Sequence, residues 1–202
     1  MNTEKLNALK ERAYKTAVEH GFHEDVKPVV FYFGLVMSEA GEAINADRKG
    51  LHADTKAFEE GVINGLSFEE KLSFEENFRL HIKDTVEDEI VDIVIRLFDF
   101  AGLKKYNLHF SSGCCPMVKG DYFAADLFVL MAFLYDVHRE DDFELRVNSL
   151  INVLASYFGM LTGSDKDLWW FVEVALANTG ERFGYYTMLA VFLLYLQANF
   201  GF

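Results

Sequence analysis

The chain has 202 residues, of which 51% are hydrophobic, and its formal net charge is −13. With 20 Phe, 9 Tyr and 2 Trp it has enough apolar side chains to bury a sizeable core, which excludes a disordered chain. The acidic charge argues against binding to nucleic acid, because a phosphate backbone attracts a basic surface. This length predicts a single domain over residues 1–202.

Helical periodicity dominates the chain, and no segment has a convincing strand pattern. Gly21 and Gly50 are typical helix ends, and Pro28 precedes a helix start. Thr85 and Asp88 can cap the start of another helix. Seven helices are predicted, over about residues 3–20, 29–49, 84–101, 121–138, 142–162, 165–178 and 185–197. Such a series predicts an all-α helical bundle.

Two stretches divide this helical pattern. Residues 51–83 are polar and broken, and the similar segments 67–70 and 73–76 each have the pattern of a capping box that opens a short helix. Residues 111–116 form the clearest predicted loop. This loop separates a first half, about residues 1–110, from a second helical half, about residues 117–202, within the one domain.

The end of the chain and the cysteines bear on location. Residues 185–202 carry no charge, but Gln197 and Asn199 interrupt the apolar run, and a membrane span needs ~20 apolar residues. A buried helix or a subunit interface is therefore favoured over a membrane anchor. No basic and then apolar run follows Met1, and the adjacent Cys114 and Cys115 suit free thiols better than a structural disulfide. Both features favour the cytoplasm.

Two carboxylate pairs with helical spacing are the main functional signal. Glu39 and Glu42 lie three residues apart in one predicted helix, and Glu89 and Asp92 lie three apart in another. Residues at this spacing share one helix face. If the two faces meet, about four negative charges gather, and a hard divalent cation with oxygen ligands would relieve their repulsion. The alternative is that all four are solvated side chains on two amphipathic helices.

Cationic residues accompany both pairs. Lys49 follows the first pair on the same predicted helix, Lys83 precedes the second pair, and Arg96 follows it in the stripe that continues to Asp99. These three cations are candidate phosphate contacts. Exposed helix ends would equally explain the two lysines, and an internal ion pair with Asp92 or Asp99 would explain Arg96.

The two pairs in their context resemble the metal-binding signature of the MazG-like, all-α nucleoside triphosphate pyrophosphohydrolases. Residues 37–43 are similar to the first motif helix of that family, and residues 81–97 are similar to its second. The resemblance covers about residues 29–101. It implies the helical bundle of that family, with extra C-terminal helices, and a homodimer.

The resemblance also implies an activity. Glu39, Glu42, Glu89 and Asp92 would be the catalytic carboxylates that hold Mg²⁺, with Mn²⁺ as a substitute, and the substrate would be a nucleoside triphosphate, cleaved to the monophosphate and pyrophosphate. Lys49, Lys83 and Arg96 remain the candidate substrate-binding residues.

The chain departs from the family pattern in its second half. Ala175 stands where the family has a lysine, and the basic tail is replaced by an apolar segment. These differences support an alternative, a catalytically degenerate relative that binds nucleotide, metal or a protein partner. A second alternative is a membrane-associated interaction protein, suggested by residues 185–202.

Other residues carry weaker signals. The six histidines are scattered without zinc-ligand spacing, which favours structural roles. Cys114 and Cys115 could form a redox switch, but an inert loop pair is favoured. Trp169 and Trp170 could stack on a base, but core packing is favoured.

Overall fold

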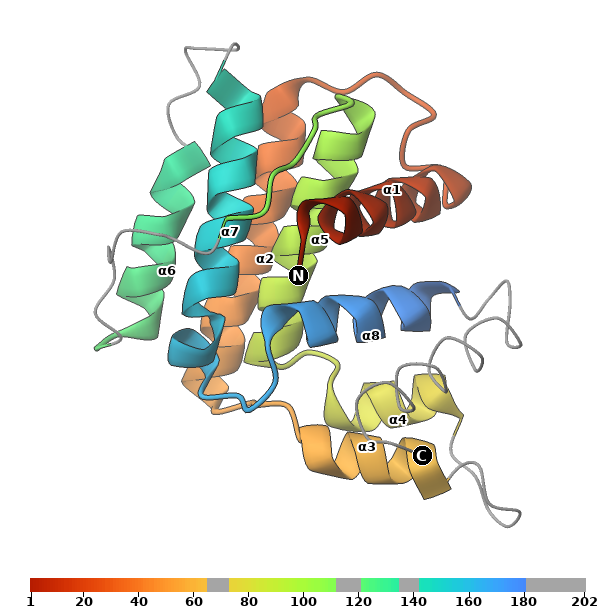
Figure 1. Ribbon diagram of the computed structural model, residues 1–202. Helices are drawn as coiled ribbons and strands as arrows, with labels where there is room; N and C mark the ends of the chain where they lie inside the picture. The colour runs from red at the N-terminus through yellow and green to blue at the C-terminus, as the bar shows by residue number, and fades with distance from the viewer. Residues whose placement is uncertain (65–72, 112–120, 135–141, 181–202) are drawn as a thin grey trace.

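The computed structural model describes residues 1–64, 73–111, 121–134 and 142–180 (Figure 1). Within these ranges there is no strand, so the predicted all-α fold is confirmed. The helices are α1 (Thr3–Glu19), α2 (Val29–Lys49), α3 (Thr55–Asn64), α4 (Phe74–His81), α5 (Val86–Leu103), α6 (Phe123–Met131), the short 3₁₀ helix η1 (Ala132–Leu134), α7 (Phe143–Thr162) and α8 (Leu168–Gly180).

Helix α5 lies at the centre of the bundle and contacts α1, α2, α7 and α8. The long helices α2, α5 and α7 run alongside one another, while α1 and α8 cross them (Figure 1). This position follows from the sequence of α5, which is apolar nearly all round. Ile90, Ile93, Leu97 and Phe98 are all fully buried. The core therefore forms around α5, and its few polar side chains must meet other helices.

The bounds of α2 and the start of α5 follow from local capping chemistry. Pro28 occupies the N-cap position of α2, and Gly50 ends the helix in the left-handed conformation with φ +68°. At the start of α5, the side chain of Thr85 accepts a hydrogen bond from the backbone N–H of Asp88. The predicted range 29–49 is confirmed, and the predicted cap at Thr85 is also confirmed.

The region predicted as polar and broken contains two short helices. Ser73 and Glu76 form the predicted capping box at the start of α4. The other predicted box, at residues 67–70, lies outside the described residues. The interpretation of residues 55–64 as broken was wrong, because they form α3. Phe58 on α3 is fully buried against Phe74 and Trp170. Tertiary packing therefore stabilises a helix that the local sequence pattern does not predict.

The second half follows the predicted pattern with shorter helices. Helix α6 ends at Met131 and η1 at Leu134, so the last residues of the predicted range 121–138 lie outside the described part. Helix α8 begins at Leu168, later than predicted, because the side chain of Asp167 caps it by accepting from the backbone N–H of Trp170. Cys114, Cys115 and the predicted helix 185–197 also lie outside the described residues.

None of the described helices is both long and apolar enough to cross a bilayer.

Residues 107–111 form an extended segment held by polar side chains from α7 on one side. Glu144 accepts a hydrogen bond from the backbone N–H of residue 107 at 2.8 Å, Asn148 from that of residue 109 at 2.7 Å, and Asn152 from that of residue 111 at 2.8 Å. Four residues of a helix rise about 6 Å, and two residues of an extended chain rise ~6.6 Å. Side chains four residues apart on α7 can therefore reach backbone N–H groups two residues apart in the extended segment.

Helix α1 serves the alternate backbone groups of the same segment. Asn7 accepts a hydrogen bond from the N–H of residue 108 and Thr3 from that of residue 110, each at 3.1 Å. We call this arrangement the amide ladder; it comprises residues 107–111 with Thr3, Asn7, Glu144, Asn148 and Asn152. Every backbone N–H of the segment has a side-chain acceptor, so the segment ties α1 to α7 without a β-sheet.

Helices α1 and α5 approach closely at Gly102. A Cβ atom at this position would overlap the Cβ and ring Cγ of Tyr14 on α1. Because two backbones can come this close only where one residue has no side chain, Gly102 sets the contact between α1 and α5.

Candidate functional site

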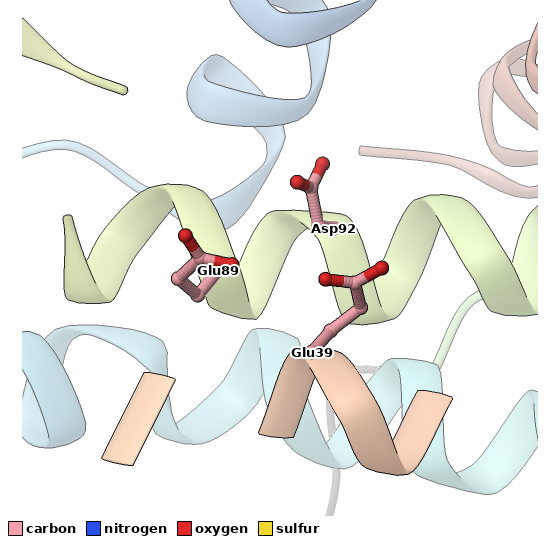
Figure 2. A group of neighbouring side chains, drawn as sticks. All are labelled: Glu39, Glu89 and Asp92. Atoms are coloured by element: carbon pink, nitrogen blue, oxygen red, sulfur yellow. The ribbon is translucent and has the colours of Figure 1, made fainter. Parts of the chain in front are cut away.

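Three of the four predicted carboxylates meet between two helices. Glu39 extends from α2 toward Glu89 and Asp92 on α5 (Figure 2). One carboxylate oxygen from each lies within 4.8 Å of the other two. We call Glu39, Glu89 and Asp92 the acidic cluster. Arg96 on α5 also contacts Glu39 across this α2–α5 interface, although the two residues lie 57 positions apart in the sequence.

Packing of α2 on α5 explains how these acids come together. The small side chains of Ala40 and Ala43 are buried beside Glu39, which allows the two helices to lie close. Glu39 is 8% exposed and Glu89 3% exposed, whereas the Asp92 side chain is 31% exposed. The cluster is therefore buried at Glu89 and open to solvent at Asp92. The alternative of fully solvated helix faces does not hold for Glu39 and Glu89.

Glu42, the fourth predicted ligand, is exposed and lies outside the group of closely spaced oxygens. It follows Glu39 by three residues on α2, so it remains on the side of the helix that carries the cluster. Its negative charge contributes to the raised pKa of Glu89. Glu42 is thus an electrostatic neighbour of the acidic cluster in this structure.

Glu89 is the most perturbed member of the cluster. Burial raises its pKa to about 8, with the charges of Asp88, Asp92 and Glu42 adding to the shift and Lys83 opposing it. Its Oε2 atom is buried and has no hydrogen-bond partner. A buried carboxylate oxygen without a partner is costly, and a cation or a proton would relieve that cost.

Asp92 is perturbed for similar reasons. Burial, together with the charges of Asp88 and Glu39, raises its pKa to about 7, against the opposing charges of Lys83 and Arg96. Both acids therefore have raised pKa values because burial, and to a lesser extent neighbouring negative charge, disfavours their ionised forms.

Lys83, predicted as a phosphate contact, lies at one side of the cluster. Its ammonium nitrogen is 3.1 Å from Asp88 Oδ2, 3.4 Å from Asp84 Oδ1 and 3.8 Å from Asp92 Oδ2. Burial by itself would lower the pKa of this ammonium, but the nearby carboxylates outweigh that effect and raise the pKa. Lys83 is therefore charged, and its side chain is 41% exposed.

Arg96 lies at the other side of the cluster. Its Nε donates a hydrogen bond to Glu39 Oε1 at 2.9 Å, so its ion pair crosses from α5 to α2. The predicted alternative, an ion pair of Arg96 with Asp92 or Asp99 on its own helix, was wrong, because Arg96 pairs with Glu39 on α2. The guanidinium is 33% exposed and lies 5.9 Å from the ring centroid of Phe22.

The third predicted cation, Lys49, is exposed in the last turn of α2. Among the residues that the structure describes, Lys83 and Arg96 are the cations that form ion pairs with the acidic cluster. The structure thus brings two of the three predicted cations to the site.

Asp99 takes a partner that the sequence analysis missed. Its Oδ1 lies 2.6 Å from His23 Nε2, and both side chains are 9% exposed. Burial raises the pKa of Asp99, and the hydrogen bond from His23 opposes that shift. A histidine 76 positions away gives no local signal, so only the fold could reveal this pair.

A second group of acids overlaps the first. Oxygens of Asp84, Asp88 and Glu89 also lie within 4.8 Å of one another. Asp88 Oδ2 in this group already accepts from Lys83 and from the backbone N–H of Asp84. The second group is therefore partly satisfied by the chain itself, in contrast to Glu89 Oε2.

The donor atoms of the acidic cluster fit a hard cation. All three side chains offer carboxylate oxygens, the ligands that Mg²⁺ and Mn²⁺ prefer. The orphaned Oε2 of Glu89 supplies a buried ligand, and the partly exposed Asp92 leaves a side open to water and substrate. Such a site can bind a divalent cation and an anion together.

The aromatic candidates belong to the core. Trp169 and Trp170 on α8 are 8% and 7% exposed, and Trp170 packs edge-on against Phe58 and Phe171. The favoured prediction of core packing is confirmed. Ala175 on the same helix is also buried.

Comparison of the chain with protein-family models, with curated proteins and with solved structures found no match in any of the three.

Proposed function

We propose that the protein is a Mg²⁺-dependent nucleoside triphosphate pyrophosphohydrolase of the MazG-like type, which cleaves a nucleoside triphosphate to the monophosphate and pyrophosphate. One observation carries the proposal: two packed helices bring three carboxylates within 4.8 Å, and the most buried of them, Glu89, has an oxygen without any partner. The resemblance of residues 37–43 and 81–97 to the two family motifs supports the same assignment.

Glu39, Glu89 and Asp92 would hold the metal, and Glu42 is close enough in sequence and charge to complete the set. When bound, Mg²⁺ supplies Lewis-acid polarisation of a phosphoryl oxygen and lowers the pKa of a water molecule. The chain contributes the geometry, since α2 packs on α5 through Ala40, Ala43 and the buried side chains of α5.

Lys83 and Arg96 would contact the phosphate chain. Each is charged, partly exposed and at the edge of the acidic cluster. Lysine and arginine provide several N–H donors, so each can hold a carboxylate and still donate to a phosphate oxygen. The overall acidic surface makes such local cations necessary for any anionic substrate.

A screen of nucleoside triphosphates with Mg²⁺ or Mn²⁺, measuring released pyrophosphate, tests the proposal. We expect pyrophosphate release that stops in EDTA and falls at least about a hundredfold in Glu89→Gln. Glu60→Gln is the matched control, because Glu60 is a surface residue of α3 paired with Lys56. Metal-independent release, or full activity in Glu89→Gln, would refute the assignment.

Ala175, which stands where the family has a lysine, is buried on α8. The missing lysine favours a second candidate, a relative that binds metal and nucleotide without turnover. Calorimetric titration with Mg²⁺ combined with the pyrophosphate assay separates the two proposals: both proteins bind the metal through the same three carboxylates, but the degenerate one releases no pyrophosphate. A homodimer in the cytoplasm belongs to the main proposal, and sedimentation of the purified chain tests the subunit number.

A further inference from the structure

Two of the three cluster carboxylates already have a cation from the chain, and the third has none. Arg96 pairs with Glu39 at 2.9 Å, and Lys83 lies 3.8 Å from Asp92. Glu89 forms neither of these ion pairs and keeps a buried oxygen without a partner. A metal ion that takes all three carboxylates must therefore share Glu39 and Asp92 with the chain's own cations.

The two cations are placed so that they can change partners. Their side chains are 41% and 33% exposed, so neither is locked in the core. The ion pair of Arg96 uses Nε, and a guanidinium carries further donors on its two terminal nitrogens. Lys83 is a flexible point charge that keeps Asp84 and Asp88 as partners when it leaves Asp92.

The cations also flank the cluster along α5. Lys83 contacts Asp88 and Asp92, whereas Arg96 lies one turn beyond Asp92. Because the two cations pair with different carboxylates of the cluster, a ligand with several phosphate groups offers oxygen acceptors to both.

We propose that Lys83 and Arg96 are internal counter-cations that exchange a carboxylate for a phosphate when a metal–polyphosphate complex enters the acidic cluster. The two cations hold the site before binding and compete with bare metal. The site therefore selects metal and polyphosphate as one unit and binds free metal weakly. This inference rests on the metal site of the proposed function and adds the order of binding and the class of ligand.

Calorimetry with two ligands tests the exchange: Mn²⁺ alone, and Mg²⁺–tripolyphosphate added as the preformed complex. The variants are Lys83→Met and Arg96→Gln, each of which removes one counter-cation. We expect each variant to bind Mn²⁺ about five- to tenfold more tightly, because a competing positive charge is gone. Each should bind Mg²⁺–tripolyphosphate about tenfold more weakly, because a phosphate contact is gone.

Two controls define the effect. Lys56→Met removes a surface charge from α3, where Lys56 pairs with Glu60, and should change neither affinity. Arg96→Lys keeps the charge and should restore Mn²⁺ affinity to the wild-type value. Because Lys83 and Arg96 pair with different carboxylates, each variant tests the exchange by itself if the other fails to fold cooperatively in a thermal melt.

Opposite shifts for the two ligands support the exchange. Shifts in the same direction, or no shift in either, overturn it. The outcome is separable from the proposed function: opposite shifts without pyrophosphate release from any nucleotide would remove the hydrolase and keep the exchange. Pyrophosphate release with parallel shifts would keep the hydrolase and remove the exchange.

Discussion

The amide ladder and the acidic cluster each bring together polar side chains from two different helices. The ladder satisfies its polar groups, whereas the cluster concentrates charges of one sign. In the ladder, five backbone N–H groups meet five side-chain oxygens from α1 and α7. In the cluster, three carboxylates from α2 and α5 face one another within 4.8 Å. The ladder pairs each donor with an acceptor, whereas the cluster brings like charges together.

This difference separates stability from function. Satisfied hydrogen bonds at the ladder stabilise the folded chain by about 1 kcal/mol each. Two like charges about 4 Å apart cost on the order of 4 kcal/mol at an effective dielectric of 20. Natural chains keep such unfavourable groupings at functional sites. We therefore expect substitutions in the ladder to change stability and substitutions in the cluster to change activity.

The largest effect is expected from Asp92→Asn. This change removes a metal ligand and should lower pyrophosphate release at least about a hundredfold. It also removes a like charge from beside Asp88 and Glu39, so the free energy of unfolding at pH 8 should not fall. Steady-state assays and urea denaturation of the same preparation measure both quantities. A large loss of stability would contradict the comparison.

The corresponding change in the ladder is Asn152→Ala. Asn152 is 3% exposed; its Oδ1 accepts from the N–H of residue 111, and its Nδ2 donates to the carbonyls of His109 and Asn148. The substitution removes three part-buried hydrogen bonds and should lower the free energy of unfolding by about 2–4 kcal/mol. Urea denaturation measures the loss, and pyrophosphate release below the transition should be unchanged.

Asn152→Asp is the matched control for the ladder. It keeps the acceptor for the N–H of residue 111 and loses both donors, so its stability should lie between those of the wild type and the alanine variant. An aspartate variant less stable than the alanine variant would show that charge, and not hydrogen bonding, dominates at this position.

The pH dependence of stability sharpens the comparison in metal-free buffer. The pKa of Glu89 is raised to about 8, so the folded chain binds a proton that the unfolded chain has lost above about pH 4.5. Stability from this group is complete below about pH 4.5 and is lost as the pH rises toward 8. Asp92, with a pKa of about 7, acts in the same direction. Wild-type stability should therefore fall by a few kcal/mol between pH 5 and 8, since one unit of pKa shift corresponds to about 1.4 kcal/mol.

Glu89→Gln should make this curve shallower, since the glutamine amide does not titrate and the contribution of Asp92 remains. Thermal melts from pH 5 to 8 measure both proteins. Asn152→Ala should lower the whole curve without changing its slope. A Glu89→Gln curve as steep as that of the wild type would show that other groups control the pH dependence.

The smallest expected effect is that of Asn148→Ala. This half-buried residue accepts one hydrogen bond from the extended segment, at the N–H of residue 109. Solvent can replace part of that bond, so the expected loss is about 1 kcal/mol by urea denaturation. A loss as large as that of Asn152→Ala would mean that the ladder breaks as a unit.

The sequence predicts those parts of the fold that local chemistry determines. Pro28 and Gly50 set α2, and Thr85 sets the start of α5. Helix α3 escapes prediction because its helical state depends on the burial of Phe58 against residues distant in sequence. Propensity and pattern are weak guides where packing decides.

The same limit applies to the site. Spacing predicts that Glu39 shares a helix face with Glu42, and Glu89 with Asp92, since helix geometry is regular. It does not predict the partner of Arg96, because reaching Glu39 depends on how α2 packs on α5. The sequence does contain a pattern that indicates the ladder. Glu144, Asn148 and Asn152 recur every four residues on α7 and form a polar stripe on a largely apolar helix.

The contact of Gly102 with Tyr14 has an evolutionary consequence. Because no side chain fits between α1 and α5 at this point, and the Cβ of Tyr14 is itself in the way, substitution at position 102 requires glycine at position 14 or a shift of the whole first helix. These two positions should therefore change together among divergent descendants of a common ancestor. Their covariation offers a way to recognise kinship after most of the remaining sequence has diverged.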